Sequence, residues 1–266
     1  MENYHSHTEF CDGRASMSEI AAAASLAGFH VWGTSPHSPV CCDSCANMKA
    51  ESVLPYLEES ARLKALYDGK MKILTGMEID YISPEFGPHI EYFRTLPLDF
   101  RIGSVHFVRT REGKPVDVDG PVERFMKYLD SEYKGDIRYV VETYFAMQME
   151  MLKFGGFNVI GHLDKIGDNA SAAFPNLEDQ HWYADFVENV ISEAVAKDVV
   201  IEINTKKYLT SGRFFPSERW WHLLKKYESR IVLSTDAHYP DKVDAGYHEA
   251  YALLEKAGLI HNLVSL

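Results

Sequence analysis

The sequence predicts an α/β fold in which seven parallel strands and their helices close into a barrel. Apolar runs of strand length alternate with amphipathic helical patterns along the whole chain, as they do in parallel βα units. Seven such units favour a barrel over an open doubly wound sheet, and the chain has no glycine-rich phosphate loop. Residues that suit a metal ion follow several runs, where a barrel builds its active site. We therefore expect a single barrel domain over residues 1–266.

The seven expected strands are runs rich in β-branched and aromatic residues. Several are almost continuously apolar, which is typical of parallel strands that are buried on both faces. They cover residues 3–7, 31–35, 72–81, 100–108, 158–162, 199–204 and 230–235. The carboxyl ends of these strands are expected to meet at one end of the barrel.

Helical patterns fill the segments between the strands. The first, residues 17–27, follows a capping box formed by Ser16 and Glu19. Further helices are expected at residues 50–67, 85–95, 122–154, 179–197, 217–227 and 246–257. The stretch from 122 to 154 is long for one helix, and Gly135 with Asp136 is expected to divide it in two. Loops at the mouth of the barrel are expected at residues 39–47 and 168–176.

Composition and charge restrict the class of protein. With 46% hydrophobic and 25% charged residues, the chain has the composition of a soluble globular protein. Its net charge of −12 argues against general nucleic-acid binding. A phosphorylated small substrate is compatible with this charge, because bound metal ions can reverse the local potential. No leader pattern and no apolar run of ~20 residues is visible, so we expect a cytoplasmic protein without a membrane segment. The sequence carries no signal for an oligomeric state.

Three of the four cysteines lie close together in the expected loop at residues 39–47, and the fourth is Cys11. The spacing Cys42-x-x-Cys45 could bind zinc or carry redox chemistry, but the chain has no second Cys-x-x-Cys and no nearby cysteine–histidine pair. We therefore expect Cys41, Cys42 and Cys45 to be free thiols at the border of the site, where they could affect substrate choice.

Nine potential metal ligands lie at or just beyond the ends of the expected strands. They are His5, His7, Asp12, His37, Glu78, His106, His162, Asp236 and His238. Imidazole and carboxylate groups are the ligands that suit zinc, manganese or iron. Several histidines around one bridging carboxylate are what a multinuclear hydrolytic site requires. Chance explains other histidines, such as His30 and His248, but it does not explain this common position.

Spacing places several of these residues on a common strand face. His5 and His7 alternate by two, so both imidazoles can reach one metal ion. Glu78 lies between two apolar residues, where an unpaired carboxylate would be costly. Either a metal ion or an internal ion pair would remove that cost. Taken singly, Asp12 is explained by an Asp-Gly turn and His106 by a core histidine, but the set as a whole favours a metal site.

The ligand set and its flanking residues resemble the polymerase and histidinol phosphatase (PHP) superfamily. The resemblance rests on His5-Ser-His7-Thr8 with Asp12-Gly13, on His37, Glu78, His106 and His162, and on the closing Asp236-Ala-His238. Longer stretches are similar to the histidinol-phosphatase branch: Gly76-Met-Glu-Ile-Asp-Tyr81, Ile102-Gly-Ser-Val-His106-Phe, Phe157-Asn-Val-Ile-Gly-His-Leu-Asp164 and Ile201-Glu-Ile-Asn-Thr205. The similarity extends from His5 to Tyr247, nearly the whole chain.

The resemblance implies a distorted seven-stranded (β/α)7 barrel, TIM-like, with a trinuclear centre of zinc, manganese or iron. It implies that the first metal is held by His5, His7, Glu78 and Asp236, the second by Glu78, His106 and His162, and the third by Asp12, His37 and His238. Glu78 would bridge the first two ions. The implied activity is hydrolysis of L-histidinol phosphate to L-histidinol and phosphate, a late step of histidine biosynthesis.

The expected chemistry is attack of a metal-bridged hydroxide on phosphorus. The residues expected to take part in catalysis are Glu78, Asp236, His238 and Asp164. A metal-bound water, Asp164 or His181 is the candidate general acid. The phosphate oxygens are expected to be held by Arg213, Lys206 or Lys165. The family often continues Glu-Ile-Asn-Thr with Ser-Gly and a nearby Arg, whereas Lys206 follows directly here and Ser-Gly-Arg213 comes later.

Two other functions are compatible with the same residues. One is a PHP phosphoesterase that acts on a nucleotide or a sugar phosphate. The other is a non-catalytic metal-binding accessory protein, which the intact ligand set argues against. Carboxylates that could pair with a substrate ammonium group are Asp117, Asp119 and Asp164, although each is also explained as a loop or capping residue. We therefore expect a small phosphomonoester with a cationic amine as substrate.

Overall fold

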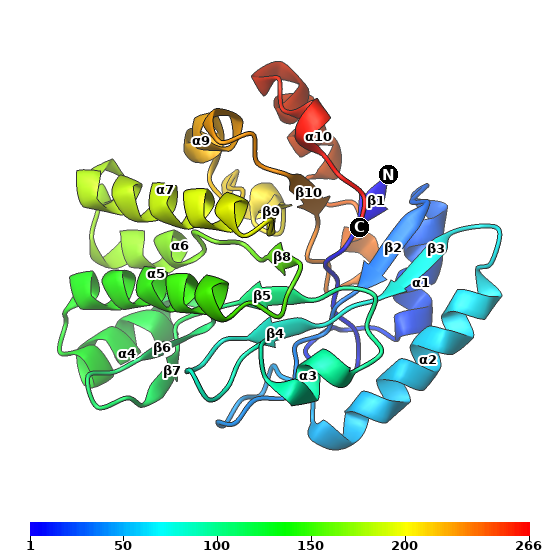
Figure 1. Cartoon of the computed structure of the whole chain (residues 1–266), viewed down its shortest axis with the longest axis horizontal. Helices are drawn as coiled ribbons and strands as arrows, with labels where there is room; N and C mark the ends of the chain where they lie inside the picture. Colours follow the sequence, from blue (N-terminus) through cyan, green and yellow to red (C-terminus); the bar gives the residue numbers. More distant parts are fainter.

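The strands form two parallel sheets in the computed structural model, which describes residues 1–266 (Figure 1). The three-stranded sheet has the order β1 (Glu2–Asn3), β2 (Val31–Thr34), β3 (Lys72–Thr75). The five-stranded sheet has the order β10 (Ile231–Ser234), β9 (Val200–Asn204), β8 (Val159–Ile160), β5 (Ile102–Ser104), β4 (Glu78–Asp80). An antiparallel pair is formed by β6 (Phe107–Arg109) and β7 (Pro115–Asp117). The predicted α/β class with parallel strands is confirmed.

The two sheets meet at their borders without forming one continuous hydrogen-bonded ladder. The expected strand 72–81 is divided at Gly76 and Met77 into β3 and β4, which belong to different sheets. Single bridges connect the sheets, between His37 and Glu78 and between Ser6 and Ala237. The closed seven-stranded barrel is therefore not present as a single sheet, because the backbone leaves the ladder around Gly76.

The helices lie outside the strands (Figure 1). They are α1 (Met17–Leu26), α2 (Val53–Leu66), α3 (Glu91–Thr95), α4 (Val122–Tyr133), α5 (Ile137–Phe154), α6 (Ile166–Ala173), α7 (His181–Ala196), α8 (Tyr208–Ser211), α9 (Trp221–Lys226) and α10 (Tyr247–Ala257). Single 3-10 turns cover Ala50–Ser52, Leu177–Asp179, Glu218–Trp220, Pro240–Lys242 and Ile260–Asn262. Helices α1 and α2 pack against the three-stranded sheet, whereas α7 and α10 pack against β9 and β10. No helix has the length and apolar character that a membrane crossing requires.

Local signals in the sequence determine several helix ends. The Ser16 hydroxyl accepts from the Glu19 backbone N–H, and the Glu19 carboxylate accepts from the Ser16 backbone N–H, so the predicted capping box is present. The long stretch is divided where expected: α4 ends before Gly135, whose φ is 75°, and Asp136 caps α5. Both predictions are confirmed.

Two local predictions are wrong. Residues 85–95 are helical only in α3, because Gly87 and Pro88 interrupt the pattern. The loop expected at 168–176 is helical as far as Ala173. Polar residues suggested a loop there, but the buried Asn169 amide donates to the carbonyls of Val118 and Gly120 at 3.1 Å each. That tertiary contact outweighs the weak local preference.

One face of the strands changes from apolar to polar along the strand direction. Eight buried apolar side chains from or beside the parallel strands form a cluster at their amino ends: Tyr4, Val31, Leu74, Phe100, Ile102, Val159, Val200 and Val232. Alternate residues, such as Trp32 and Ile201, belong instead to the larger core that packs under the helices. With a period of two, the inner face continues from Val200 to Glu202 and from Val232 to Asp236. The polar residues therefore meet above an apolar floor.

Two glycines make room for one aromatic ring in this floor. A Cβ at Gly76 would lie 2.2 Å from Phe100 Cζ, and one at Gly33 would lie 2.8 Å from it. We expect Gly76→Ala to lower the free energy of unfolding by about 1–3 kcal/mol, because the ring has no space to withdraw. Thermal unfolding measures this loss. Gly76→Ala combined with Phe100→Leu should recover part of it, and an unchanged midpoint in the single variant would contradict the clash.

Candidate metal centre

The structure brings all nine residues of the predicted ligand set together at the carboxyl ends of the strands. Four groups place one nitrogen or oxygen atom per residue within 4.8 Å of one another: His7, Asp12, His37 and His238; His5, Glu78 and His162; His5, His7 and Asp236; and His37, Asp80 and His106. The groups are connected through His5, His7 and His37, so they form one continuous cluster. Residues up to 233 positions apart in the chain contribute to it.

Glu78 is fully buried at the centre of the cluster. Its Oε2 lies 3.2 Å from His5 Nε2 and 2.9 Å from His37 Nδ1. Its Oε1 lies 2.9 Å from His162 Nε2 and 3.4 Å from His106 Nε2. Burial by itself would raise the pKa of Glu78, but the surrounding histidines hold it well below its ordinary value. The carboxylate therefore stays ionised, with one oxygen directed to each of two histidine groups.

Two aspartates complete the cluster, and of these Asp236 is buried whereas Asp12 lies toward solvent. Asp236 Oδ1 lies 3.1 Å from His7 Nε2 and 3.9 Å from His5 Nε2. Asp12 lies 3.3 Å from His238 Nε2 through Oδ2 and 3.5 Å from His7 Nδ1 through Oδ1. The Asp12 side chain is 26% exposed and that of His238 is 12% exposed. This part of the cluster is therefore its open mouth.

Six buried polar atoms of the nine residues have no hydrogen-bond partner: His5 Nε2, His7 Nε2, His37 Nδ1, Asp12 Oδ1, Glu78 Oε2 and His162 Nδ1. Buried polar atoms are rarely unsatisfied, and each costs about 1–3 kcal/mol. The nitrogens of His5, His7 and His37 lie 3.2, 3.6 and 2.9 Å from Glu78 Oε2. Asp12 Oδ1 lies 3.5 Å from His7 Nδ1. Imidazole nitrogens and carboxylate oxygens in this arrangement are the donor set of divalent transition metals. The residues therefore fit metal ions.

Two histidines lie on the other side of Glu78, and their pKa values are shifted in opposite directions. His106 Nε2 lies 3.2 Å from His162 Nε2. Burial would lower the pKa of His106, but Asp80 and Glu78 raise it to about 9. Burial and nearby Lys165 lower the pKa of His162 to about 4, so this imidazole is neutral at pH 7 and offers a lone pair. Either a proton or a metal ion can lie between the two Nε2 atoms, and their separation is compatible with both.

Sequence reasoning assigned no role to two buried carboxylates beside the cluster. Glu202 Oε1 accepts a hydrogen bond of 2.7 Å from His5 Nδ1, and Asp80 Oδ1 accepts one of 2.7 Å from His106 Nδ1. The alternation of strand residues could have indicated both. Glu202 lies two positions after Val200, and Asp80 two positions after Glu78, so all four side chains are expected on the inner face.

Two residues of the set have a left-handed backbone conformation that non-glycine residues rarely adopt. The φ angle is 22° at His162 and 51° at Asp236. This conformation costs about 1–2 kcal/mol at each residue. Such strain is concentrated at functional sites, where the surrounding structure imposes it.

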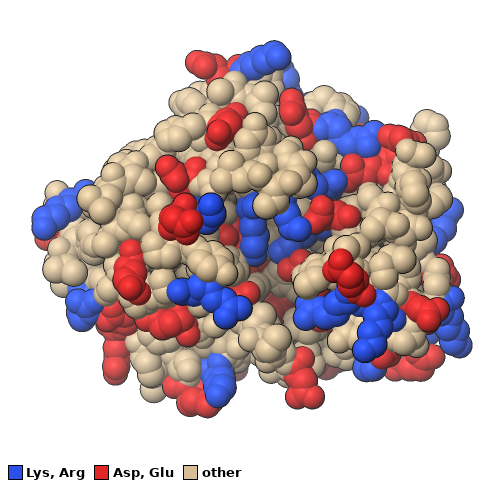
Figure 2. All heavy atoms as spheres, turned by 180° about the vertical axis from the view of Figure 1, so that it is seen from behind, with Lys and Arg blue, Asp and Glu red and all other residues tan.

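Two of the three predicted phosphate-binding cations border the cluster. Lys206 Nζ lies 3.2 Å from Asp236 Oδ1 and 3.3 Å from His238 Nε2. Lys165 pairs with Asp119 at 2.8 Å. Burial would lower the pKa of Lys165, but the carboxylates, Asp119 foremost, raise it above its ordinary value, so the ammonium group stays charged. Lys and Arg side chains gather around a hollow on one face of the molecule (Figure 2), although the chain as a whole is acidic.

The third cation, Arg213, and the candidate acid Asp164 contact each other, and neither has a hydrogen bond or ion pair to a residue of the ligand set. Arg213 donates to Asp164 at 3.2 Å and also pairs with Glu178. Asp164 additionally accepts from the Ser217 backbone N–H at 2.9 Å. Burial raises the pKa of Asp164 to about 6. The structure does not bring His181 to the site, because it is exposed at the start of α7.

Comparison with known proteins identifies the family. The family model described as the PHP domain matches residues 3–206, which is more than half of the chain. The chain belongs to the PHP domain family. The matched span contains seven of the nine residues of the ligand set, and the other two are Asp236 and His238.

Curated PHP relatives cover almost the whole chain. The histidinol-phosphatase of Bacillus subtilis is 31% identical over 268 residues, which cover 93% of this chain and 96% of that protein. The probable histidinol-phosphatase of Schizosaccharomyces pombe is 27% identical, with 96% of this chain and 86% of that protein covered. A solved structure of the Lactococcus lactis histidinol phosphate phosphatase, complexed with zinc, L-histidinol and phosphate, matches with a TM-score of 0.74 at 22% identity, covering 96% and 93% of the two chains. The structural match shows that the folds agree.

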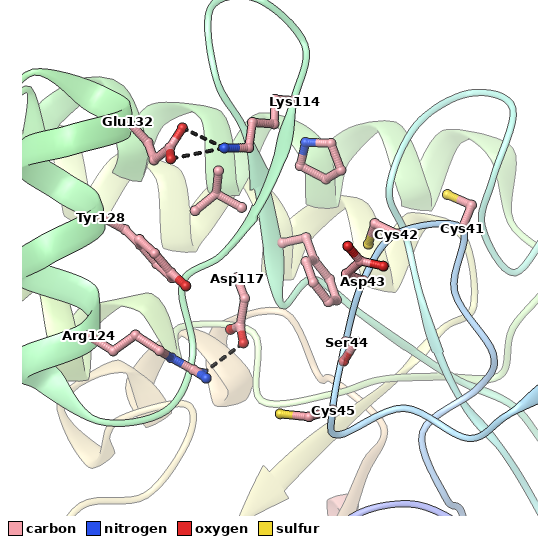
Figure 3. Close-up of a pocket in the computed structure, with 13 residues that line it drawn as sticks. Cys41, Cys42, Asp43, Ser44, Cys45, Lys114, Asp117, Arg124, Tyr128 and Glu132 are labelled. Atoms are coloured by element: carbon pink, nitrogen blue, oxygen red, sulfur yellow. Dashed lines mark hydrogen bonds and ion pairs between the residues drawn. The ribbon is translucent and has the colours of Figure 1, made fainter.

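The cysteine loop of this PHP chain lines a cavity of about 840 Å³ against the β6–β7 hairpin and α4 (Figure 3). All four cysteines are free thiols, which confirms the prediction made for Cys41, Cys42 and Cys45. Arg124 pairs with Asp117 at 2.7 Å and Lys114 pairs with Glu132 at 2.9 Å, whereas Asp43 has no ion pair. The cavity therefore carries one uncompensated carboxylate, and it is favourable for a cationic group.

Proposed function

We propose that this PHP protein is a metal-dependent phosphomonoesterase that hydrolyses L-histidinol phosphate to L-histidinol and phosphate. The observation that carries the proposal is the gathering of nine buried or half-buried potential metal ligands in one cluster that has Glu78 at its centre, with Lys206 and Lys165 at its border. Relatives named histidinol-phosphatase cover more than nine-tenths of the chain. The reaction belongs to histidine biosynthesis.

The contacts support three metal positions. We assign His5, His7, Glu78 and Asp236 to the first, Glu78, His106 and His162 to the second, and Asp12, His37 and His238 to the third. Zinc, manganese and iron all suit these donors. The zinc in the Lactococcus lactis structure supports zinc as one of them. Divalent ions held there supply positive charge to the phosphate oxygens and lower the pKa of coordinated water.

The protein contributes cations and a buried environment around the phosphate. Lys206, which is 31% exposed, is free to turn from Asp236 toward a phosphate oxygen at the mouth. The Lys165 ammonium is 10% exposed and held in place by Asp119. Fixed cations in such a partly desolvated site stabilise charge better than cations in water. Asp164, whose pKa of about 6 favours the protonated form more than that of an exposed aspartate, is the candidate proton donor to the leaving oxygen.

We also propose that the two sheets act as one distorted seven-stranded barrel around this site. Its support is the apolar floor, to which Tyr4, Val159 and Val232 contribute from different parts of the chain. The two single bridges between the sheets lie directly beside the ligand residues His7 and Glu78. The ring of strands is thus held together where the metal ligands are.

The cavity beside the cysteine loop is the proposed site of the amine-bearing leaving group. One of its lining residues is Phe107, which directly follows the proposed metal ligand His106 in the chain. Of the three aspartates predicted to bind an ammonium group, Asp119 and Asp164 pair with Lys165 and Arg213. Asp117 lines this cavity and pairs with Arg124 at 2.7 Å. Asp43 lies in the same cavity without an ion-pair partner, and its carboxylate would favour a cationic substrate over a neutral one.

Purified protein is expected to hydrolyse histidinol phosphate with a kcat/KM at least ~10-fold above that of an uncharged phosphomonoester of similar size. One charge pair in a partly desolvated cleft supplies about 1.4 kcal/mol of discrimination. Phosphate release from a panel that includes a nucleotide, a sugar phosphate and phosphotyrosine measures the preference. Asp43→Asn should reduce the preference, mainly through KM.

The matched control is Asp198→Asn, because Asp198 is exposed on the surface, 81% by side-chain area, and pairs only with Arg230. Equal rates on charged and uncharged monoesters, or a preference for a nucleotide or a sugar phosphate, would contradict histidinol phosphate as the substrate. Either result would favour a phosphoesterase that acts on another small phosphoester. No phosphate release from any compound by metal-loaded protein would favour the non-catalytic alternative.

A further inference from the structure

Two buried carboxylates outside the ligand set contact the far ring nitrogens of two proposed ligand histidines. Glu202 and Asp80 are both 0% exposed, and each accepts a 2.7 Å hydrogen bond from Nδ1, of His5 and His106 respectively. We propose that Glu202 and Asp80 are positioning residues that fix the tautomer of these histidines, so that each Nε2 presents its lone pair to the metal centre. This inference rests on the proposed function, because it requires that the cluster binds metal.

The geometry of His5 requires this tautomer. Its Nδ1 faces Glu202 and its Nε2 faces Glu78 Oε2 at 3.2 Å, with no hydrogen-bond partner of its own. A neutral imidazole carries its single proton on one nitrogen only. With the proton on Nδ1, the lone pair of Nε2 points into the cluster. A carboxylate behind a ligand histidine fixes ring orientation and raises its basicity.

The second oxygen of Glu202 is also fully committed as an acceptor. Oε2 accepts from the His162 backbone N–H at 2.9 Å and from Asn204 Nδ2 at 3.2 Å. The Asn204 amide cannot turn over without loss, because its Oδ1 accepts from the Lys206 backbone N–H at 3.0 Å and its Nδ2 also donates to Asp236 at 3.1 Å. Glu202 thus accepts directly from two ligand residues, His5 and His162, and is connected to a third, Asp236, through the Asn204 amide, which donates to both carboxylates.

A glutamine at position 202 has the same shape but cannot make these contacts. It supplies one acceptor oxygen, and two fixed donors on His162 and Asn204 require that oxygen. Its NH2 group then faces His5 Nδ1, which has to accept instead of donate. The proton of His5 moves to Nε2, and the atom that should bind the metal is blocked.

Asp80 occupies an equivalent position at His106. Its Oδ2 accepts from Asn47 Nδ2 at 2.9 Å, and the same Nδ2 donates to the Ser38 carbonyl at 2.9 Å. Asn47 Oδ1 accepts from Ser44 Oγ at 2.6 Å, which fixes the amide orientation. An asparagine at position 80 would therefore present its NH2 group to His106 Nδ1. The same argument holds for two histidines on two sides of Glu78.

The test measures zinc affinity of the full chain, without substrate, by competition with a chromogenic chelator. We expect Glu202→Gln and Asp80→Asn each to bind zinc about 10- to 100-fold more weakly than wild type, with unchanged circular dichroism. Glu202→Asp keeps two acceptor oxygens and should bind more tightly than Glu202→Gln, although glutamine is closer in size. If Glu202 only filled space, Glu202→Gln would bind zinc more tightly than Glu202→Asp. Glu142→Gln is the control, because Glu142 is 42% exposed and pairs with Arg138 on the surface of α5, outside the site.

Nitrogen-15 spectra of histidine in the zinc-loaded proteins report which ring nitrogen carries the proton. Wild type should show a protonated Nδ1 at His5 and His106, and Glu202→Gln should lose this signature at His5 only. Wild-type zinc affinity in both amide variants would overturn the inference, and so would weaker binding that arises only from loss of fold. A wild-type protein that binds no zinc, manganese or iron would instead overturn the proposed function itself, together with this inference.

Discussion

Glu78→Gln is expected to lower kcat about a thousandfold, whereas Asp12→Asn lowers it about tenfold. Glu78 directs one oxygen to His5 and His37 and the other to His106 and His162, so it is placed to bridge two ions. A neutral amide bridges two cations poorly, and the loss of roughly 4 kcal/mol corresponds to three decades in rate. Asp12 lies at the half-exposed mouth and would serve one ion only.

Steady-state kinetics on histidinol phosphate, at metal content matched by elemental analysis, separate these effects. Asp12→Asn serves as the control for loss of a carboxylate at the same centre. Comparable residual activity of the two variants would contradict the bridging role of Glu78. If Glu78→Gln loses activity only because it holds less metal, the role of Glu78 is in metal binding and not in the rate of the chemical step.

Removal of metal is expected to abolish activity, and addition of manganese or zinc should restore it. The reason is the number of donors: nine groups exceed the ~4 protein ligands that a single zinc ion takes. Elemental analysis of protein purified without added metal should therefore find more than one transition-metal ion per chain. At most one ion per chain, with all nine residues intact, would rule out the trinuclear centre. Full activity after exhaustive chelation would rule out metal dependence.

Much of the fold follows from periodicity in the sequence. The capping box at Ser16 and the division at Gly135 are local signals, and local signals fix helix ends. The division of the third strand run at Gly76 is different in kind. It depends on Phe100, which comes from a distant segment and occupies the space beside the glycine. No pattern within residues 72–81 contains that contact.

The candidate site shows the same contrast. The carboxyl ends of the parallel strands place distant side chains side by side, so the positions of His5, Glu78 and Asp236 in the chain are enough to group them. Partners within the site are harder to foresee, because they depend on side-chain direction and on ångström distances. Arg213 lies near a strand tip in the sequence, yet in the structure it pairs with Asp164 and Glu178. Lys206 directly follows Thr205 and lies at the cluster.

The left-handed backbone at His162 and Asp236 has a consequence for how the protein balances stability against activity. Each residue holds a conformation that glycine adopts freely and that other residues adopt only under constraint. Glycine at both positions would relieve this strain but would remove two of the proposed metal ligands. In the proposed function, the imidazole and the carboxylate therefore contribute to activity at the expense of a more stable chain, as is common for catalytic sites.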